Sequence, residues 1–123
     1  MQPNSRFEFK PYPFSQLHEG YLTTGYYSCN YRTALQLYYY DTECHTYFPF
    51  ATLTVNLPDE PITDNHCVYI DTNNCPFALS LLIDVLHCAE FTGHVAQSGR
   101  CYYSEVRLIP DELYKYIPYK EEI

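Results

Sequence analysis

The chain has 123 residues, with 15 acidic and 7 basic side chains and a formal net charge of -8 at pH 7. Its apolar content of 46% is ordinary for a globular protein and too high for a disordered chain. A surface this acidic repels nucleic acid and anionic membrane, so we expect direct contact with neither and attraction to basic proteins instead.

Compartment and domain organisation follow from what the sequence lacks. No stretch approaches the roughly 20 apolar residues of a membrane span, and residues 1–14 lack the apolar core of a signal peptide. We therefore expect a soluble, cytoplasmic protein whose six cysteines are reduced thiols. The length predicts one domain, 1–123, with an irregular N-terminal segment, 1–20, and a frayed tail, 119–123.

The first half of the chain is rich in strand signals. A short edge strand is expected within residues 1–20, followed by β-prone runs at 21–32 and 34–40. Short polar residues then predict a turn at 41–43. Residues 50–57 alternate strictly between apolar and polar side chains, which predicts one strand with a single buried face.

The second half contains the one segment with helical periodicity. A proline-rich, acidic loop at 58–65 and a short strand at 67–70 come first. Asp71 to Asn74 then suit a turn and helix cap, because Asp and Asn side chains bond to nearby backbone. The apolar residues that follow fall at i, i+3, i+4, i+7, i+8 and i+11 and predict the main helix: Ala78, Leu81, Leu82, Val85, Leu86 and Ala89.

The C-terminal part reads as a hairpin followed by a short helix. Strands are expected at 94–97 and 101–109, joined by a turn at Ser98-Gly99. Pro110 and the two acids after it suit the first turn of a helix. The predicted fold is therefore α+β: an antiparallel β-sheet packed against one main α-helix, with a short C-terminal helix.

No motif for catalysis, metal binding or nucleotide binding is present. The chain has no nucleophile elbow, phosphate-binding loop, H-E-x-x-H or C-x-x-C pattern. Its adjacent His-Cys pairs point in different directions and make poor zinc ligands, so we expect no metal and no cofactor. Cys75, at the expected helix start, is the best candidate for a reactive thiol, against the alternative that it is buried under the cap.

Two segments carry a resemblance, PFATLTVNL at 49–57 and YIDTNNCP at 69–76. Together with Thr92-Gly93, Ser98-Gly99 and Cys101-Tyr102, they resemble a family of small proteins of unknown function encoded on conjugative elements, plasmids and phages of Gram-positive gut bacteria. The resemblance covers roughly residues 48–110. It carries no catalytic residue, and it implies a mobile genetic element as context.

That context leaves three functional hypotheses open. The first is an anti-defence protein, such as an anti-CRISPR factor, that acts as a DNA mimic and inhibits a Cas nuclease, with a Cas9-type enzyme as the first candidate. The second is an accessory binding module of conjugation or phage replication. The third is a thiol-dependent enzyme that uses Cys75 or Cys101.

For the binding hypotheses we expect acids near loops and strands to meet a basic nucleic-acid-binding partner, alongside a run of three tyrosines. The candidate residues are Asp41, Glu43, Asp59, Glu60, Asp64, Tyr38, Tyr39 and Tyr40. The sequence leaves the oligomeric state open, and a Tyr-rich sheet edge could pair two copies in a homodimer.

Overall fold

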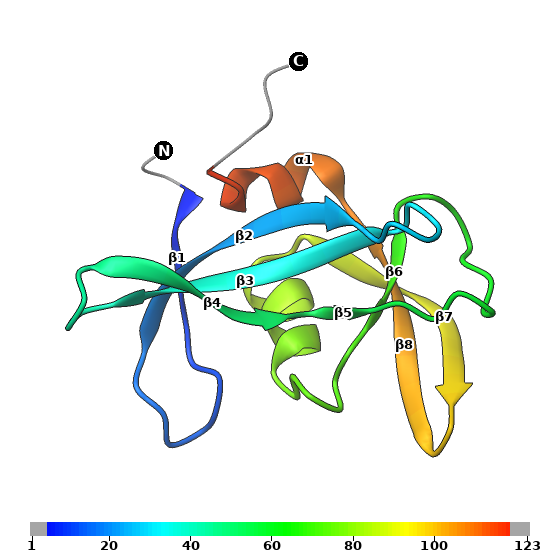
Figure 1. Ribbon diagram of the computed structural model, residues 1–123, viewed down its shortest axis with the longest axis horizontal. Coiled ribbons are helices and arrows are strands. Elements are labelled where there is room, and N and C mark those ends of the chain that lie inside the picture. Colours follow the sequence, from blue (N-terminus) through cyan, green and yellow to red (C-terminus); the bar gives the residue numbers. More distant parts are fainter. Residues whose placement is uncertain (1–4, 119–123) are drawn as a thin grey trace.

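Two antiparallel four-stranded sheets form the framework of the computed structural model, which describes residues 5–118 (Figure 1). The first sheet has the strand order β1 (Phe7–Phe9), β2 (His18–Tyr26), β3 (Thr33–Asp41), β4 (Thr46–Thr52). The second has the order β5 (Thr54–Val55), β6 (Cys67–Ile70), β8 (Cys101–Leu108), β7 (Ala89–Ser98). Every neighbouring pair is antiparallel.

One extended segment joins the two sheets at Leu53. The Leu53 N–H donates to the carbonyl of Leu35 at 2.8 Å, while its own carbonyl accepts the N–H of Asp71 at 2.9 Å. The side chain of Leu53 is fully buried. The expected single strand over 50–57 is therefore divided between two sheets, because the backbone changes its partner from β3 to β6 at this residue.

Thr54 departs from the expected alternation of buried and exposed residues. Its side chain is buried, although the pattern placed it on the exposed face. Its hydroxyl lies 2.9 Å from the Tyr27 hydroxyl and accepts the Leu35 N–H at 3.3 Å. A hydroxyl can be buried at low cost when such partners are present, and periodicity alone does not reveal them.

The expected main α-helix is absent from the described residues, so the α+β prediction is wrong and the fold is mostly β. A short helical segment over 78–85 stands in its place, and most of it is the π-helix η2 (Ser80–Val85). The Leu86 N–H donates to the Leu81 carbonyl at 2.9 Å, which is an i→i+5 bond.

The π-turn explains why the apolar stripe misled. Its wider turn breaks the 3.6-residue period, so Leu82 is buried while Val85 is 54% exposed. His87 then takes a positive φ of 52°, which reverses the chain. Ala89, the last residue of the stripe, is the first residue of β7 instead of a helical residue.

The segment from Asp71 to Asn74 forms a turn that its own side chains stabilise. The Asp71 carboxylate accepts the Asn74 side-chain amide at 2.8 Å and the Asn74 N–H at 3.3 Å. The Cys75 N–H donates to the Asp71 carbonyl at 2.8 Å. The turn was expected, but the cap was not found: η2 begins after Leu79 with no side-chain cap bond.

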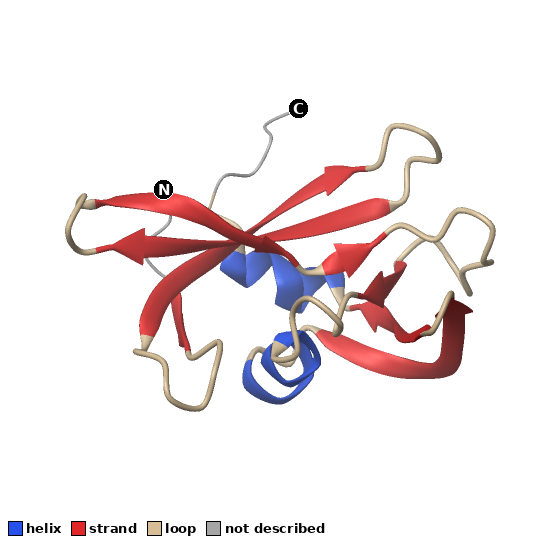
Figure 2. Cartoon of the chain, turned by 60° about the horizontal axis from the view of Figure 1, so that its bottom comes forward, coloured by secondary structure: helices blue, strands red, loops and turns tan. Residues whose placement is uncertain are grey.

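Both sheets and the helical segments contribute to a single main hydrophobic core. Figure 2 shows the helices beside the strands of the sheets. Its members include Leu22 and Leu37 from the first sheet, Val68 and Val106 from the second, Leu82 and Leu86 from the η2 region, and Leu113 and Ile117 near the C-terminus. The expected short C-terminal helix is present as α1 (Pro110–Leu113), followed by the 3-10 turn η3 (Tyr114–Tyr116).

The remaining boundary predictions have mixed outcomes. The C-terminal hairpin is confirmed, although β7 starts at Ala89, five residues before the expected strand. The short edge strand expected within 1–20 is confirmed as β1, and the segment also contains the start of β2. The predicted frayed tail, 119–123, lies outside the described residues. Within residues 5–118, no helix has the length and apolar character needed to cross a membrane.

Candidate functional site

The three consecutive tyrosines of β3 do not form one surface. Because side chains alternate along a strand, Tyr38 and Tyr40 share one face and Tyr39 lies on the other. Tyr38 stacks on Tyr21 with ring centroids 5.0 Å apart, and Tyr40 packs against Tyr47 at 5.1 Å. Tyr39 instead makes edge contacts with the rings of His18 and Phe50.

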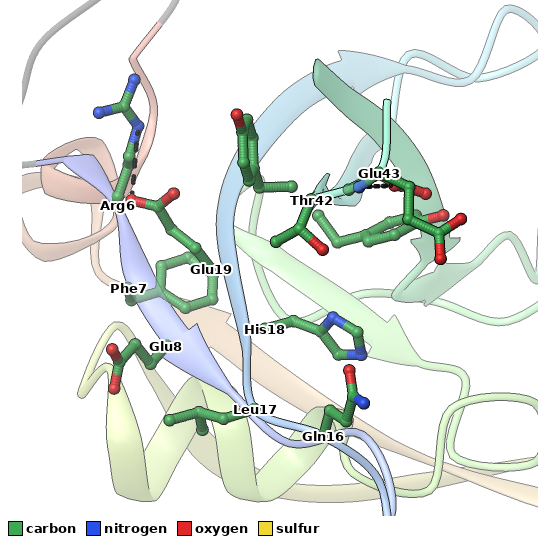
Figure 3. Close-up of a pocket in the computed structure, with 12 residues that line it drawn as sticks. Arg6, Phe7, Glu8, Gln16, Leu17, His18, Glu19, Thr42 and Glu43 are labelled. Carbon is green, nitrogen blue, oxygen red and sulfur yellow. Dashed lines mark hydrogen bonds and ion pairs between the residues drawn. The ribbon is translucent and has the colours of Figure 1, made fainter. Parts of the chain in front are cut away.

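A groove of about 860 Å³ lies where the end of β3 approaches the start of β2 and β1 (Figure 3). We call it the acidic groove, because its lining includes the four carboxylates of Glu8, Glu19, Asp41 and Glu43, together with Tyr39 and Tyr40. In Figure 3, Glu8 and Glu43 lie on opposite sides of this lining.

The fold brings the four carboxylates together from separate parts of the chain. Glu8 and Glu19 are directly opposite each other in the register of β1 and β2. Asp41 ends β3, and its carboxylate accepts the N–H groups of Glu43 and Cys44 at 2.8 and 3.0 Å. Those bonds stabilise the turn that carries Glu43 into the groove.

Within residues 5–118, Glu19 is the one carboxylate of the four that has charged and phenolic partners. Its Oε1 lies 3.8 Å from the Arg6 Nε, and its Oε2 accepts the Tyr47 hydroxyl at 3.0 Å. The Arg6 guanidinium also lies over the Tyr47 ring, 5.5 Å from its centroid. Burial and the hydrogen bond to Glu19 raise the pKa of Tyr47 to about 12, so Tyr47 remains a neutral donor.

The charge of the acidic groove is therefore only partly neutralised. Four carboxylates face one guanidinium, and the carboxylates of Glu8 and Glu43 have no hydrogen-bond or ionic partner within residues 5–118. Both side chains are exposed. A concave surface with unpaired carboxylates and aromatic walls attracts cations, and guanidinium groups in particular bond to carboxylates and stack on aromatic rings.

The predicted interface acids divide between two ends of the molecule. Asp41 and Glu43 line the acidic groove, whereas Asp59, Glu60 and Asp64 belong to the loop between β5 and β6, at the other end of the long axis (Figure 1). The structure therefore places the candidate acids on two separate surfaces.

Asp64 is also less available than an unpaired carboxylate. It accepts the Arg107 Nε at 2.9 Å and the His66 N–H at 2.9 Å. The Arg107 hydrogen bond is the main reason that the pKa of Asp64 is lowered. Asp59 is exposed and has no such partner among the described residues.

Sequence reasoning missed one ionisable residue of structural importance, Glu105. Its side chain is fully buried in β8, and its carboxylate accepts the Thr63 N–H at 2.8 Å, the Thr63 hydroxyl at 2.5 Å and the Thr92 hydroxyl at 2.6 Å. The sequence did contain a signal for its burial. Side chains alternate along a strand, so Glu105 shares a face with Tyr103, which points inward.

The two candidate thiols, Cys75 and Cys101, differ in exposure. Cys75 is buried, and burial raises its pKa; its sulfur lies 3.6 Å from the Thr52 carbonyl. Cys101 is half-buried at the β7–β8 turn. Over the part of the chain that the structure describes, no three His, Cys, Asp or Glu side chains are placed to hold a metal ion.

Comparisons with known proteins give one result. The model of a protein family described as a domain of unknown function, DUF4313, matches residues 22–122. The matched residues include both segments that carry the resemblance and extend it into the Tyr-rich N-terminal third. No curated protein and no solved structure matches the chain.

Proposed function

The chain belongs to the DUF4313 family of domains of unknown function, and from that premise we propose that it acts by binding a basic, nucleic-acid-binding protein through the acidic groove. The proposal rests on two exposed carboxylates, those of Glu8 and Glu43, which have no ionic or hydrogen-bond partner within residues 5–118 and lie on opposite sides of a groove that Tyr39 and Tyr40 also line. Arginine side chains that normally hold DNA phosphate fit such a site, because a carboxylate offers the same two-oxygen acceptor.

The target that best agrees with this chemistry is a Cas nuclease of the Cas9 type. Such enzymes hold nucleic acid in positively charged channels and use arginines to read the protospacer-adjacent motif. A small protein of net charge -8 could occupy that site in place of DNA. The mobile-element context implied by the resemblance supports an anti-CRISPR role inside the bacterial host, without direct contact to nucleic acid.

The test is cleavage of target DNA by guide-loaded Cas9 with the protein titrated from zero to a few-fold excess. Complete loss of cleavage near one equivalent is expected. Inhibition should be stronger when the protein is added before DNA than after it, and raising salt should weaken it, because carboxylate–guanidinium attraction is screened.

A charge-matched pair of variants assigns the surface. The double variant E8Q/E43Q removes two carboxylates from the acidic groove, and D59N/D84N removes two exposed carboxylates elsewhere. Both raise the net charge by the same amount, so only the first should lose inhibition if the groove makes the contact. Each lost charge pair is expected to cost about 1–3 kcal/mol, or roughly 5- to 150-fold in affinity.

The outcomes also separate the alternatives. Equal losses in both double variants would assign inhibition to overall charge and not to the groove. Unchanged cleavage at large excess would reject the Cas9 target, and capture of transfer or replication proteins would then favour an accessory module of conjugation or phage replication. A fast-reacting, low-pKa thiol would favour the Cys-dependent enzyme, although burial and the raised pKa of Cys75 weigh against it.

A further inference from the structure

A second groove, of about 700 Å³, has the opposite electrostatic character. It lies between the turn 27–32, the residues before β6 and the start of α1. Its lining includes Tyr26, Tyr31, Tyr114, Arg32, His66 and Asn65. No Asp or Glu is among the described residues that line it, although the whole chain has 15 acids. We call it the tyrosine groove.

The tyrosines of this groove are unusually exposed for aromatic side chains. Tyr31 is 79% exposed, Tyr26 74% and Tyr114 50%. Tyrosine joins a flat apolar ring to a polar hydroxyl and is enriched where proteins bind ligands and partners. Three such rings around one hollow provide surfaces on which another planar ring could stack.

The turn that carries Tyr31 is held in one conformation by many bonds. The Tyr27 N–H donates to the Arg32 carbonyl at 2.9 Å, and the Tyr31 N–H donates to the Tyr27 carbonyl at 2.8 Å. The Asn30 side chain accepts the Arg32 N–H at 3.1 Å and donates to the Asn56 side chain at 3.0 Å. A ligand would therefore lose little affinity to ordering this turn.

Tyr31 itself has a backbone conformation that tyrosine rarely adopts. Its φ is 58°, in the left-handed region where Gly and Asn are favoured over bulky residues. A non-glycine residue held there by surrounding bonds is a common feature of binding sites. Here the conformation presents the ring to solvent instead of burying it, so burial does not explain the choice of tyrosine.

Arg32 supplies a positive charge that pairs with no carboxylate within residues 5–118. Its guanidinium donates to the backbone carbonyls of Leu57 at 2.8 Å and Glu60 at 2.6 Å. It forms no ion pair with any described acid. Two of its five N–H donors are thus used, and the fixed side chain keeps its charge at the edge of the tyrosine groove.

From these features we infer that the tyrosine groove binds a free nucleotide, with the base stacked on the exposed tyrosine rings and the phosphate beside Arg32. The combination of aromatic faces, an unneutralised guanidinium and no carboxylate matches a ligand that is both planar and anionic. Its volume is within the range of small-molecule sites. This inference is independent of the function proposed for the acidic groove.

The net charge selects a free nucleotide over a nucleic-acid strand. A single nucleotide places one phosphate group near Arg32, whereas a strand would place many phosphates over a surface of net charge -8. Binding of a strand needs several Lys or Arg side chains to neutralise its phosphates. The tyrosine groove offers only Arg32 and His66.

The experiment is titration of the full chain with AMP in reducing buffer, followed by the backbone amide signals in two-dimensional NMR. We expect saturable shifts in residues 24–33, 65–66 and 110–114. Adenosine should bind at least about fivefold more weakly than AMP, because it lacks the group that Arg32 would contact. An oligothymidylate strand should also bind more weakly than AMP.

The matched variants are Tyr31→Asn and Tyr102→Thr. Asn tolerates a positive φ, so Tyr31→Asn removes the ring while keeping the turn, and AMP affinity should fall at least about fivefold. Tyr102 is 64% exposed on β8, outside the groove, and its replacement should leave AMP affinity unchanged.

Several results would overturn the inference. The first is the absence of saturable shifts at about 10 mM AMP, since a ligand with a millimolar Kd nearly saturates its site at that concentration. The second is a set of shifts located outside the groove. The third is an AMP affinity that Tyr31→Asn leaves unchanged. Equal binding of adenosine would reject an anionic ligand. Tighter binding of the oligothymidylate would replace the free nucleotide with single-stranded nucleic acid.

Discussion

Glu105 should contribute more to stability than any other ionisable residue of the chain. Its buried carboxylate accepts three hydrogen bonds, two from Thr63 and one from Thr92. Hydrogen bonds to charged groups contribute about 1.5–3 kcal/mol each, and they are not additive. Glu105→Ala leaves those donors without an acceptor and should lower the free energy of unfolding by about 3–5 kcal/mol.

Glu105→Gln gives an intermediate case, because it keeps one oxygen acceptor and the shape of the side chain. We expect it to cost about 1–2 kcal/mol, which is the difference between charged and neutral acceptors. The measurement is urea unfolding followed by circular dichroism, with the midpoint and the slope compared among the three proteins. A loss of less than about 1 kcal/mol for Glu105→Ala would refute the view that this carboxylate holds the 58–66 loop against the second sheet.

The pH dependence supplies a second check with a defined sign. Burial acts to raise the pKa of Glu105, but the hydrogen bonds from Thr63 and Thr92 and the charge of His94 outweigh it, so the pKa is lowered from 4.5. The folded state therefore binds the proton less readily than the unfolded state. The stabilisation is fully present above about pH 4.5 and is lost as pH falls through the lower, folded-state pKa. The stability difference between the natural chain and Glu105→Gln should shrink over that range, and a difference independent of pH would contradict the assignment.

Two further predictions test packing and thiol accessibility. A Cβ added at Gly20 would lie 2.6 Å from the Tyr38 carbonyl oxygen, so Gly20→Ala should cost about 1–3 kcal/mol in thermal unfolding. Gly25→Ala, in the same strand with open space around it, should cost much less; equal losses would reject the packing argument. Cys29 and Cys44 are exposed and should react first with a thiol reagent in the native state, whereas buried Cys88, whose pKa burial raises to about 12, should react only on unfolding.

The strands were largely predictable from the sequence because their signals are local. The β-prone runs, the turn at 41–43 and the C-terminal hairpin all correspond to observed elements. The apolar stripe over 78–89 did not distinguish an α-helix from what the structure contains. A π-turn followed by an extended residue and the start of a strand buries apolar residues at similar spacing. The positive φ of His87, which ends the helical segment, has no clear signal in a histidine side chain.

The candidate site was only half predictable, for a different reason. Asp41 and Glu43 lie in a turn whose composition is recognisable, and they do line a groove. Glu8 and Glu19 join them only through the register of β1 and β2 and the order of the first sheet. Pairing between distant segments is a property of the whole fold, so a scan of local composition could not group these four residues or separate them from the 58–66 loop.

The two grooves show how the acidic residues are distributed over the surface, which composition alone does not reveal. If 15 acids served only solubility, they would be spread without regard to concave surfaces. Instead, among the described residues, four carboxylates line one groove, and none lines the other or pairs with its arginine. Each arrangement leaves like charges or an unpaired charge in a hollow, which costs stability in the free protein. A ligand of opposite charge would offset that cost in each groove, which is what the two proposed binding sites supply.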